Sequence, residues 1–255
     1  MVIKSKDAIF KMKTAGKLLA EIFEIIDEII QPGVTTLMID QWIEAQSKSK
    51  NLVSQSKGYM GYKHVSCISI NQVVVHGVPS SKVVVQEGDL VKVDVCVAWK
   101  GYCADMARAY VAGNVKPSIE LKKLIDTAQL ALDAGIQKAI VGNRLFDISH
   151  EIQQVAENQG YGIVRDFAGH GIGKSMHEEP DVPNFGKKGT GMVLRPGMTF
   201  AIEPMITIGS YEVIVLEDGW TVETTDQSLA MHVEDTILIT QDGPEILTRL
   251  QRQNV

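Results

Sequence analysis

Residues 88–110, GDLVKVDVCVAWKGYCADMARAY, consist of two apolar, β-branched runs joined by Lys100 and Gly101. This pattern predicts a β-hairpin that turns at the Lys-Gly pair. Because side chains alternate along a strand with a period of two, Asp94 and Asp105 would then lie on one face as diagonal neighbours, about 7 Å apart. A three-residue loop would shift the register by one and send the two carboxylates to opposite faces. The hairpin is therefore expected to present a carboxylate pair.

The first strand of this hairpin has a second copy in the chain. GDLVKVD (88–94) aligns with GMTFAIE (197–203), and the two opening glycines are 109 positions apart. Gly33 and Gly142 are separated by the same 109 positions, and each follows a long helical pattern and precedes another. A chance likeness of two glycine-started strands is the alternative. An internal duplication predicts two α/β halves related by a pseudo-two-fold axis.

The surrounding segments repeat in the same order. Apolar residues at helical spacing predict four helices, over residues 5–30, 36–50, 118–140 and 145–159. Short β-branched runs punctuated by glycine predict strands from residue 66 and again after residue 162. The expected fold class is α+β, with both halves (about 5–113 and 117–248) in one domain of residues 1–255.

Two further carboxylates interrupt apolar strand patterns. Glu203 stands in FAIEPM and Glu234 in MHVEDT. An edge strand with a solvated carboxylate would explain either one alone, but a buried glutamate needs a partner. If both join Asp94 and Asp105, each pair of charges repels by about 4 kcal/mol at 4 Å and an effective dielectric of 20. Two divalent cations would balance the four negative charges.

The segment GHGIGKSMHEEP (169–180) supplies two histidines in a glycine-rich context. A zinc-protease helix would need a second histidine where Asp181 stands, and a nucleophile elbow would need a glycine where His177 stands. Both motifs are excluded. What remains is an irregular segment in which His170 and His177 point toward a ligand or are ordinary loop histidines.

One histidine and the four carboxylates form an oxygen-rich candidate ligand set without a thiolate. The set is Asp94, Asp105, His170, Glu203 and Glu234. Such donors suit Mn, Fe, Co or Zn in a two-metal hydrolytic site better than a structural zinc site. In a site of this kind the ions activate water for attack on a carbonyl, and a glutamate carries the proton to the leaving amine.

Composition limits the other functions. The net charge of −6 and the pI near 5.5 argue against nucleic acid as the main partner. Three cysteines without metal-knuckle spacing, no signal sequence and no run of 18 apolar residues predict a cytoplasmic protein that does not enter membranes. A group of lysines near the start forms either a solvated helix face or a contact with RNA or the ribosome: Lys4, Lys6, Lys11, Lys13 and Lys17.

The sequence resembles the bacterial type I methionine aminopeptidases over essentially its whole length. The motifs that carry the resemblance are CISINQVVVHGVP, GDLVKVDV, GHGIG, MHEEP, LRPGMTFAIEPM, DGWTV and VEDT. The resemblance implies the pita-bread fold, in which two pseudo-symmetric α/β halves surround a central antiparallel sheet. It also implies removal of the initiator methionine from nascent polypeptides whose second residue is small. We expect the protein to be a monomer that holds two divalent ions.

The same resemblance assigns roles to individual residues. It implies that all five candidate ligands bind metal, that Asp105 and Glu234 bridge the ions, and that Glu203 also shuttles the proton. His177 would contact the scissile peptide and His76 the substrate near its amino end. A methionine-sized pocket would be lined by Tyr59, Tyr62, Cys67 and Trp220, with Met176 nearby, although each is also a suitable core residue.

Some positions depart from the pattern that is common in the family. They are Cys96, Ala104, Met106, Met176 and Asp235. None of them removes a candidate ligand, but altered hydrogen bonds around a metal site change affinity or rate by about 10- to 100-fold.

Three other functions fit parts of the sequence. A proline-directed aminopeptidase of the same fold would usually carry a sizeable N-terminal domain. The type II methionine enzymes carry a large helical insert between the second histidine and the next glutamate, whereas only 25 residues separate His177 from Glu203 in this sequence. A peptide-binding paralogue without catalysis would normally lose ligands. A cysteine hydrolase built on Cys96 or Cys103 with His76 lacks an orienting motif.

Overall fold

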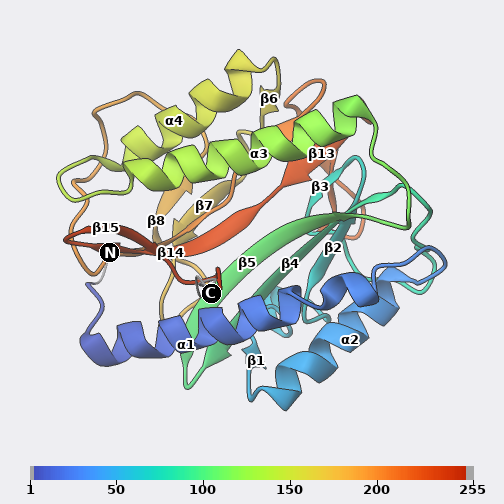
Figure 1. The fold of residues 1–255 in the computed structure, drawn as a ribbon, viewed down its shortest axis with the longest axis horizontal. Coiled ribbons are helices and arrows are strands. Elements are labelled where there is room, and N and C mark those ends of the chain that lie inside the picture. The colour runs from blue at the N-terminus through green and yellow to red at the C-terminus, as the bar shows by residue number, and fades with distance from the viewer. Residues whose placement is uncertain (1–2, 251–255) are drawn as a thin grey trace, which may run out of the picture.

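The computed structural model describes residues 3–250, and its helices and strands alternate in two blocks along this part of the chain (Figure 1). The helices are α1 (Lys6–Phe23), α2 (Thr36–Ser49), α3 (Ile119–Lys138) and α4 (Leu145–Asn158), with 3₁₀ turns at Ile26–Glu28 and Tyr59–Gly61. The strands are β1 (Val53–Ser54), β2 (Cys67–Ile70), β3 (Val73–Val75), β4 (Leu90–Trp99), β5 (Tyr102–Val111), β6 (Gly162–Ile163), β7 (Ala168–Gly171), β8 (Glu178–Pro183), β9 (Thr199–Ile202), β10 (Met205–Thr207), β11 (Val213–Val215), β12 (Val222–Thr224), β13 (Ala230–His232), β14 (Glu234–Thr240) and β15 (Gly243–Ile246).

A nine-stranded antiparallel sheet joins the two blocks. Its main path is β1-β4-β5-β14-β9-β7-β8, with β2 added to β4 and β15 added to β14. The halves meet where β5 of the first pairs with β14 of the second. Two three-stranded sheets, β13-β10-β6 and β11-β12-β3, complete the strand structure of the described residues.

The predicted hairpin is confirmed in its register. β4 and β5 pair from Leu90 with Val111 to Trp99 with Tyr102, so that Asp94 lies opposite Ala107 and Cys96 opposite Asp105. The turn residues Lys100 and Gly101 both have positive φ, 49° and 78°. This is the backbone that a two-residue hairpin turn requires, because it matches the twist of the flanking strands.

Alternation along the strands separates a helix side from a site side. Val91, Val93, Val95 and Val97 of β4 pack against buried residues of α1 and α2. In the second half the helix-facing residues of β9 and β14 pack against α3 and α4: Phe200, Ile202, Ile237 and Ile239. Each fully buried side chain of this kind contributes about 1.5–3 kcal/mol. Figure 1 shows the two helix pairs on opposite sides of the strands.

The internal duplication predicted at an offset of 109 is confirmed by backbone contacts. The bounds of α2 and α4 differ by 109 at both ends, as do the first residues of β4 and β9. The isolated bridge between Thr35 and Val84 recurs between Arg144 and Val193, again 109 positions later. The two halves therefore repeat the same connection from helix to strand.

The first helix is shorter than predicted. α1 ends at Phe23 instead of about residue 30, and the chain continues through a 3₁₀ turn at Ile26–Glu28. Ile26 and Ile30 are nevertheless buried in the same core as α1. The apolar spacing therefore persists beyond the end of the helix, because the turn packs on the same surface.

None of the helices within residues 3–250 is both long enough and apolar enough to cross a lipid bilayer.

Candidate active site

All five predicted metal ligands line one cavity of about 140 Å³ between the two halves of the sheet. Asp94 and Asp105 reach it from β4 and β5, and Glu234 from the first position of β14. Glu203 follows the last residue of β9, where Pro204 has no N–H with which to extend the strand. Asp94 and Glu203 thus occupy equivalent places in the repeat, as the aligned strands predicted.

His170 enters the cavity from β7. Its Nδ1 lies 3.0 Å from the carbonyl oxygen of Gly171, and its Nε2 lies 3.9 Å from Asp105 Oδ2 and 3.7 Å from Glu203 Oε1. A neutral imidazole that donates Nδ1–H to the Gly171 carbonyl turns the lone pair of Nε2 toward the carboxylates. This is the orientation that a metal-binding histidine needs.

Crowding strongly perturbs the acidic groups. Burial raises the pKa of Glu203 to about 8, and burial together with the nearby Glu203 raises the pKa of Asp105 to about 7. The pKa values of Asp94 and Glu234 are also raised well above their ordinary range, by burial and then by Asp105. Burial lowers the pKa of His170 to about 4, which keeps it neutral. Protein groups alone therefore stabilise these four negative charges poorly.

The donor set fits divalent cations. One oxygen or nitrogen from each of Asp105, His170 and Glu234 lies within 4.8 Å of the others. Glu234 is 2% exposed, and its Oε1 makes no hydrogen bond with any residue between 3 and 250. A buried carboxylate oxygen without a donor is costly unless a cation binds it. Carboxylates with one imidazole match Mn, Fe, Co or Zn.

Thr236 supports Asp105 and was not anticipated from the sequence. Its Oγ1 accepts a hydrogen bond from the Asp105 N–H at 2.8 Å and donates to the Asp105 carbonyl at 2.9 Å. The two residues join β5 to β14 beside the carboxylates. Since Thr236 follows Glu234 by two positions, it lies on the same strand face, and this period of two is the signal that could have identified it.

His232 is a second neighbour that sequence analysis missed. It is 2% exposed, and its Nε2 lies 3.2 Å from Glu203 Oε2 without hydrogen-bond geometry. Burial lowers the pKa of His232 to about 4, so the ring is neutral. His232 precedes Glu234 by two positions in the motif MHVEDT. This spacing could have identified it as a residue on the same side of the chain as Glu234.

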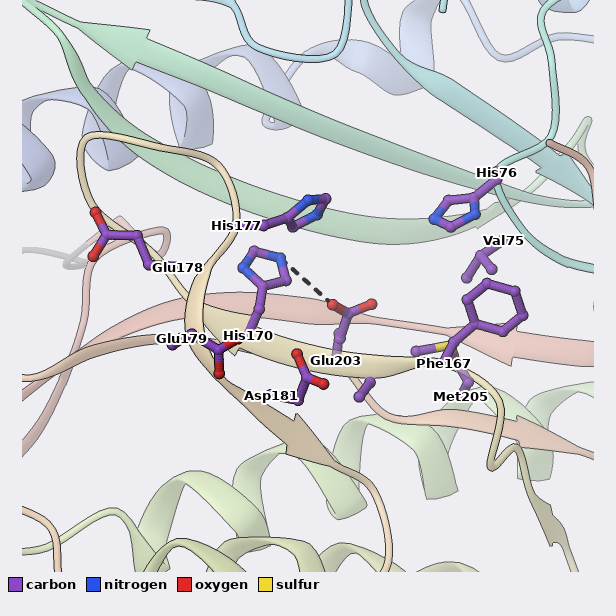
Figure 2. Close-up of a pocket in the computed structure, with 11 residues that line it drawn as sticks. Val75, His76, Phe167, His170, His177, Glu178, Glu179, Asp181, Glu203 and Met205 are labelled. Carbon is purple, nitrogen blue, oxygen red and sulfur yellow. Dashed lines mark ion pairs between the residues drawn. The ribbon is translucent and has the colours of Figure 1, made fainter. Parts of the chain in front are cut away.

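His177 and His76 line an outer cleft of about 430 Å³ (Figure 2), and both of them, like His170 and Glu203, also line the inner cavity. The His177 ring is 4.4 Å from that of His170, and its Nδ1 lies 3.1 Å from the Tyr59 hydroxyl. Burial lowers the pKa of His177.

His76 lies across the cleft beside Phe167, at a ring distance of 5.4 Å. Burial, followed by the nearby His232 and His177, lowers the pKa of His76 to about 4. Its φ of 59° places a non-glycine residue in the left-handed region. Such backbone costs about 1–3 kcal/mol and is concentrated at functional sites.

The predicted pocket residues also meet at the inner cavity: Tyr59, Tyr62, Cys67, Met176 and Trp220. The Tyr62 and Trp220 rings are 4.9 Å apart. Tyr62 donates its hydroxyl hydrogen to the Ser66 carbonyl at 2.9 Å.

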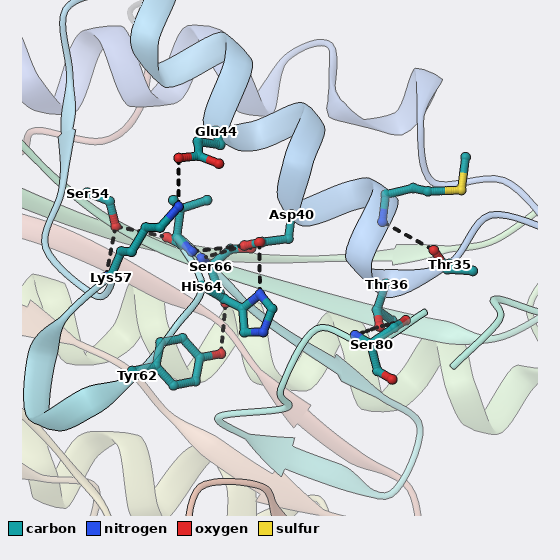
Figure 3. A network of polar contacts seen from close by, with 12 residues as sticks. Thr35, Thr36, Asp40, Glu44, Ser54, Lys57, Tyr62, His64, Ser66 and Ser80 are labelled. Carbon is teal, nitrogen blue, oxygen red and sulfur yellow. Dashed lines mark hydrogen bonds and ion pairs between the residues drawn. The ribbon is translucent and has the colours of Figure 1, made fainter. Parts of the chain in front are cut away.

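Asp40 of α2 holds this wall of the cavity in place (Figure 3). One of its carboxylate oxygens accepts hydrogen bonds from the Val65 N–H, the Ser66 N–H and the Ser66 hydroxyl, at 3.0, 3.0 and 2.7 Å. Its other oxygen lies 3.1 Å from His64 Nδ1. A helix of the first half therefore fixes the loop that carries Tyr62.

The positions that depart from the family pattern fall on different sides of the sheet. Met106 belongs to the core under α1 and α2. Asp235 contacts Arg108, Thr248 and Arg249, away from the cavity. Cys96, by contrast, lines the cavity, as does Met176.

Comparisons with known proteins identify relatives of this chain. A model of metallopeptidase family M24 matches residues 11–241. A methionine aminopeptidase from Clostridium acetobutylicum is 45% identical over 248 residues, which cover 97% of this chain and 98% of the relative. The crystal structure of a methionine aminopeptidase from Thermotoga maritima superimposes with a TM-score of 0.95 at 42% identity, covering 98% of this chain and 100% of that chain.

A more distant structure shares the fold. Prolidase from Pyrococcus furiosus superimposes with a TM-score of 0.77 at 24% identity, and the match covers 98% of this chain and 66% of that chain.

Proposed function

The chain belongs to metallopeptidase family M24 and is an enzyme of the methionine aminopeptidase type. We propose that it removes methionine from nascent proteins and peptides whose second residue is small. The observation that carries the proposal is the convergence of four carboxylates and one neutral histidine, drawn from both halves of the sheet, on one cavity.

We assign two divalent ions, Co, Mn, Fe or Zn, to this cavity. Their ligands would be Asp94, Asp105, His170, Glu203 and Glu234, with Asp105 and Glu234 shared between the ions. When bound, the ions would balance the carboxylate charge and supply Lewis-acid activation of water and of the scissile carbonyl.

The protein groups would orient the substrate and move the proton. Glu203 has a raised pKa, which suits a carboxyl group that takes a proton from water and passes it to the leaving amine. The lowered pKa values of His177 and His76 favour the neutral ring, which can donate one hydrogen bond and accept another. His177 would contact the scissile peptide, and His76 the substrate near its amino end.

The methionine side chain would occupy the inner cavity. Tyr59, Tyr62, Cys67 and Trp220 would contact it, and Met176 would lie nearby. A thioether packs favourably against aromatic rings, which supports methionine as the preferred first residue.

A peptide panel on metal-stripped protein, with ions added back one at a time, tests the proposal. With Mn or Co, we expect methionine release from Met-Ala and Met-Gly peptides, little release from a Met-Lys peptide, and nearly none from Leu-Ala or Ala-Pro peptides. The metal-stripped protein should be inactive. Comparable release of leucine would overturn the pocket assignment, and full activity without added metal in the presence of a chelator would overturn the metal assignment.

We further propose that residues 1–255 act as one catalytic unit, as a monomer in the cytoplasm. Contact with the ribosome, if it is made through the N-terminal helix, would depend on lysines other than Lys4, whose side chain is 4% exposed and paired inside the molecule.

A further inference from the structure

The segment before α1 is tied to the loop that carries His177. The Lys4 N–H donates to the Gly197 carbonyl at 2.9 Å, and the Lys4 ammonium lies 2.6 Å from Glu178 Oε2. These residues are 174 positions apart, yet the exposed fractions of the two side chains are only 4% and 20%. This pair is therefore partly desolvated and specific in geometry, unlike a surface ion pair.

Glu178 uses its second oxygen to organise the loop itself. Oε1 accepts a hydrogen bond from the Lys174 N–H at 2.9 Å. Burial alone would raise the pKa of Glu178, but Lys4 and the loop N–H groups hold it below its ordinary range. The carboxylate thus joins two segments, the residues before α1 on one side and the 173–178 loop on the other.

Close packing leaves this loop little freedom. A Cβ added at Gly173 would lie 2.4 Å from Glu178 Oε1 and 2.5 Å from Lys4 Cε. The Gly173 carbonyl accepts from the Cys103 N–H at 2.7 Å, which fixes the start of the loop to β5. A larger residue at this position would require the ends of the Glu178 and Lys4 side chains to shift.

The other side of the loop faces the active site. Met176 and His177 both line the inner cavity, while Glu178 lines the outer cleft and not the inner cavity, and Figure 2 shows its side chain directed away from His170 and His177. His177 lies at the mouth of the cavity, where its ring is partly accessible to solvent, and among the described residues its hydrogen-bond and ring partners are Tyr59 and His170. Its position therefore depends on the backbone of the loop.

We infer that the ion pair between Lys4 and Glu178 holds the 173–178 loop in place and thereby positions Met176 and His177 for the substrate. Lys4 is then a positioning residue of the reaction, an inference that rests on the proposed function. The segment before α1 thus supports the substrate site through the contact of Lys4 with Glu178.

Lys4→Met tests this inference, because it keeps most of the apolar stem and removes the ammonium. In the Mn-loaded enzyme we expect kcat/KM for a Met-Ala peptide to fall by about 10- to 100-fold, the loss of one buried hydrogen bond to a charge, mainly through KM. Hydrogen exchange of amides 174–178 should accelerate, while Mn affinity measured by calorimetry stays unchanged. Lys4→Arg, which keeps the charge, should restore most of the activity.

Lys13→Met is the matched control. Lys13 lies in α1 and pairs with Glu245 at 2.7 Å, but both side chains are substantially exposed, at 43% and 35%. This variant should keep wild-type kinetics and exchange. The double variant Lys4→Met with Glu178→Gln should lose no more activity than the more damaging of the two single variants. Each substitution removes the same ion pair, so their effects should not add.

Two outcomes would overturn the inference. One is unchanged exchange of amides 174–178 in Lys4→Met, and the other is faster exchange throughout the protein, which would indicate a general loss of stability. Accelerated loop exchange in a protein whose wild type releases methionine from no peptide would instead support the loop contact and refute the proposed function.

Discussion

At the scale of single residues, the site depends on neutral histidines beside crowded carboxylates. Burial lowers the pKa values of His170 and His232 to about 4, so neither ring balances the negative charge near neutral pH. His170 is oriented by the Gly171 carbonyl. His232 lies beside Oε2 of Glu203, the carboxylate to which we assign proton transfer. We therefore expect His232 to restrict where Glu203 can point.

Replacing His232 tests this expectation. His232→Leu fills a similar space without a polar atom, and it should lower kcat for a Met-Ala peptide by about 10- to 100-fold, as is typical when a group that orients a metal ligand is lost. His232→Gln keeps an amide that can reach the carboxylate, and it should lose less. Steady-state kinetics and calorimetric Mn titration of both variants provide the measurement. Wild-type turnover in the leucine variant would show that Glu203 needs no such neighbour.

At the scale of elements, one face of β14 lines the cavity and the other face makes buried ion pairs. Glu234 faces the cavity, whereas Asp235, the next residue, is fully buried on the helix side. Its carboxylate lies 2.6 Å from Arg108 Nη2 of β5 and 2.7 Å from Arg249 Nη2. Arg249 also lies 2.6 Å from Asp133 of α3. The strand that supplies Glu234 to the cavity is thus fixed to a neighbouring strand, a helix and the segment that contains Arg249.

Asp235→Ala should therefore destabilise the protein strongly. Removing one partner of a buried ion pair typically costs about 3–5 kcal/mol, because the remaining charges lose their compensation. The free energy of unfolding, measured by urea denaturation monitored by circular dichroism, should fall by that amount. Asp242→Ala changes an exposed aspartate just beyond the same strand, and it should stay within about 0.5 kcal/mol of wild type. Equal stability of the two variants would contradict a structural task for Asp235.

Local sequence patterns predicted which helices and strands form better than they predicted where each one ends. The turn at Lys100 and Gly101 fixed the hairpin register, because a two-residue turn leaves one pairing of the strands. The end of α1 at Phe23 was missed, because Ile26 and Ile30 continue the buried spacing after the helix has stopped. Periodicity reports which surface is buried, and it does not report whether the backbone remains helical.

At the scale of the whole molecule, the duplication explains why distant residues meet. Asp94 and Glu203 could be related from sequence because the 109-residue offset aligns their strands. Contacts that neither the repeat nor the alternation along a strand relates carried no sequence signal. Lys4 with Glu178 is one such contact, since it joins segments 174 positions apart that belong to no repeated pattern. The convergence of the candidate metal ligands on one cavity was thus predictable, whereas the contacts that position the loops around them required the structure.

The shared cavity also couples the stability of both halves to pH. In the folded, metal-free protein, Asp105 and Glu203 have pKa values of about 7 and 8, whereas the unfolded chain has ordinary values near 4. Between about pH 4 and pH 8 the folded state therefore binds more protons than the unfolded state, and stability falls as pH rises. The loss is on the order of 1.4 kcal/mol per group for each pH unit crossed.

Thermal unfolding at pH 5.5, 7.0 and 8.5 measures this coupling. With a chelator present, the melting temperature of wild type should decrease across the series, because ionising the carboxylates restores their repulsion. The double variant Asp105→Asn with Glu203→Gln removes both groups, and its metal-free melting temperature should change less with pH. Saturating Mn should reverse the trend in wild type, since metal competes with protons for the same oxygens and binds more tightly as pH rises. A chelated wild type that follows the double variant at all three pH values would mean that these carboxyl groups titrate normally, and that their crowding is relieved without a cation.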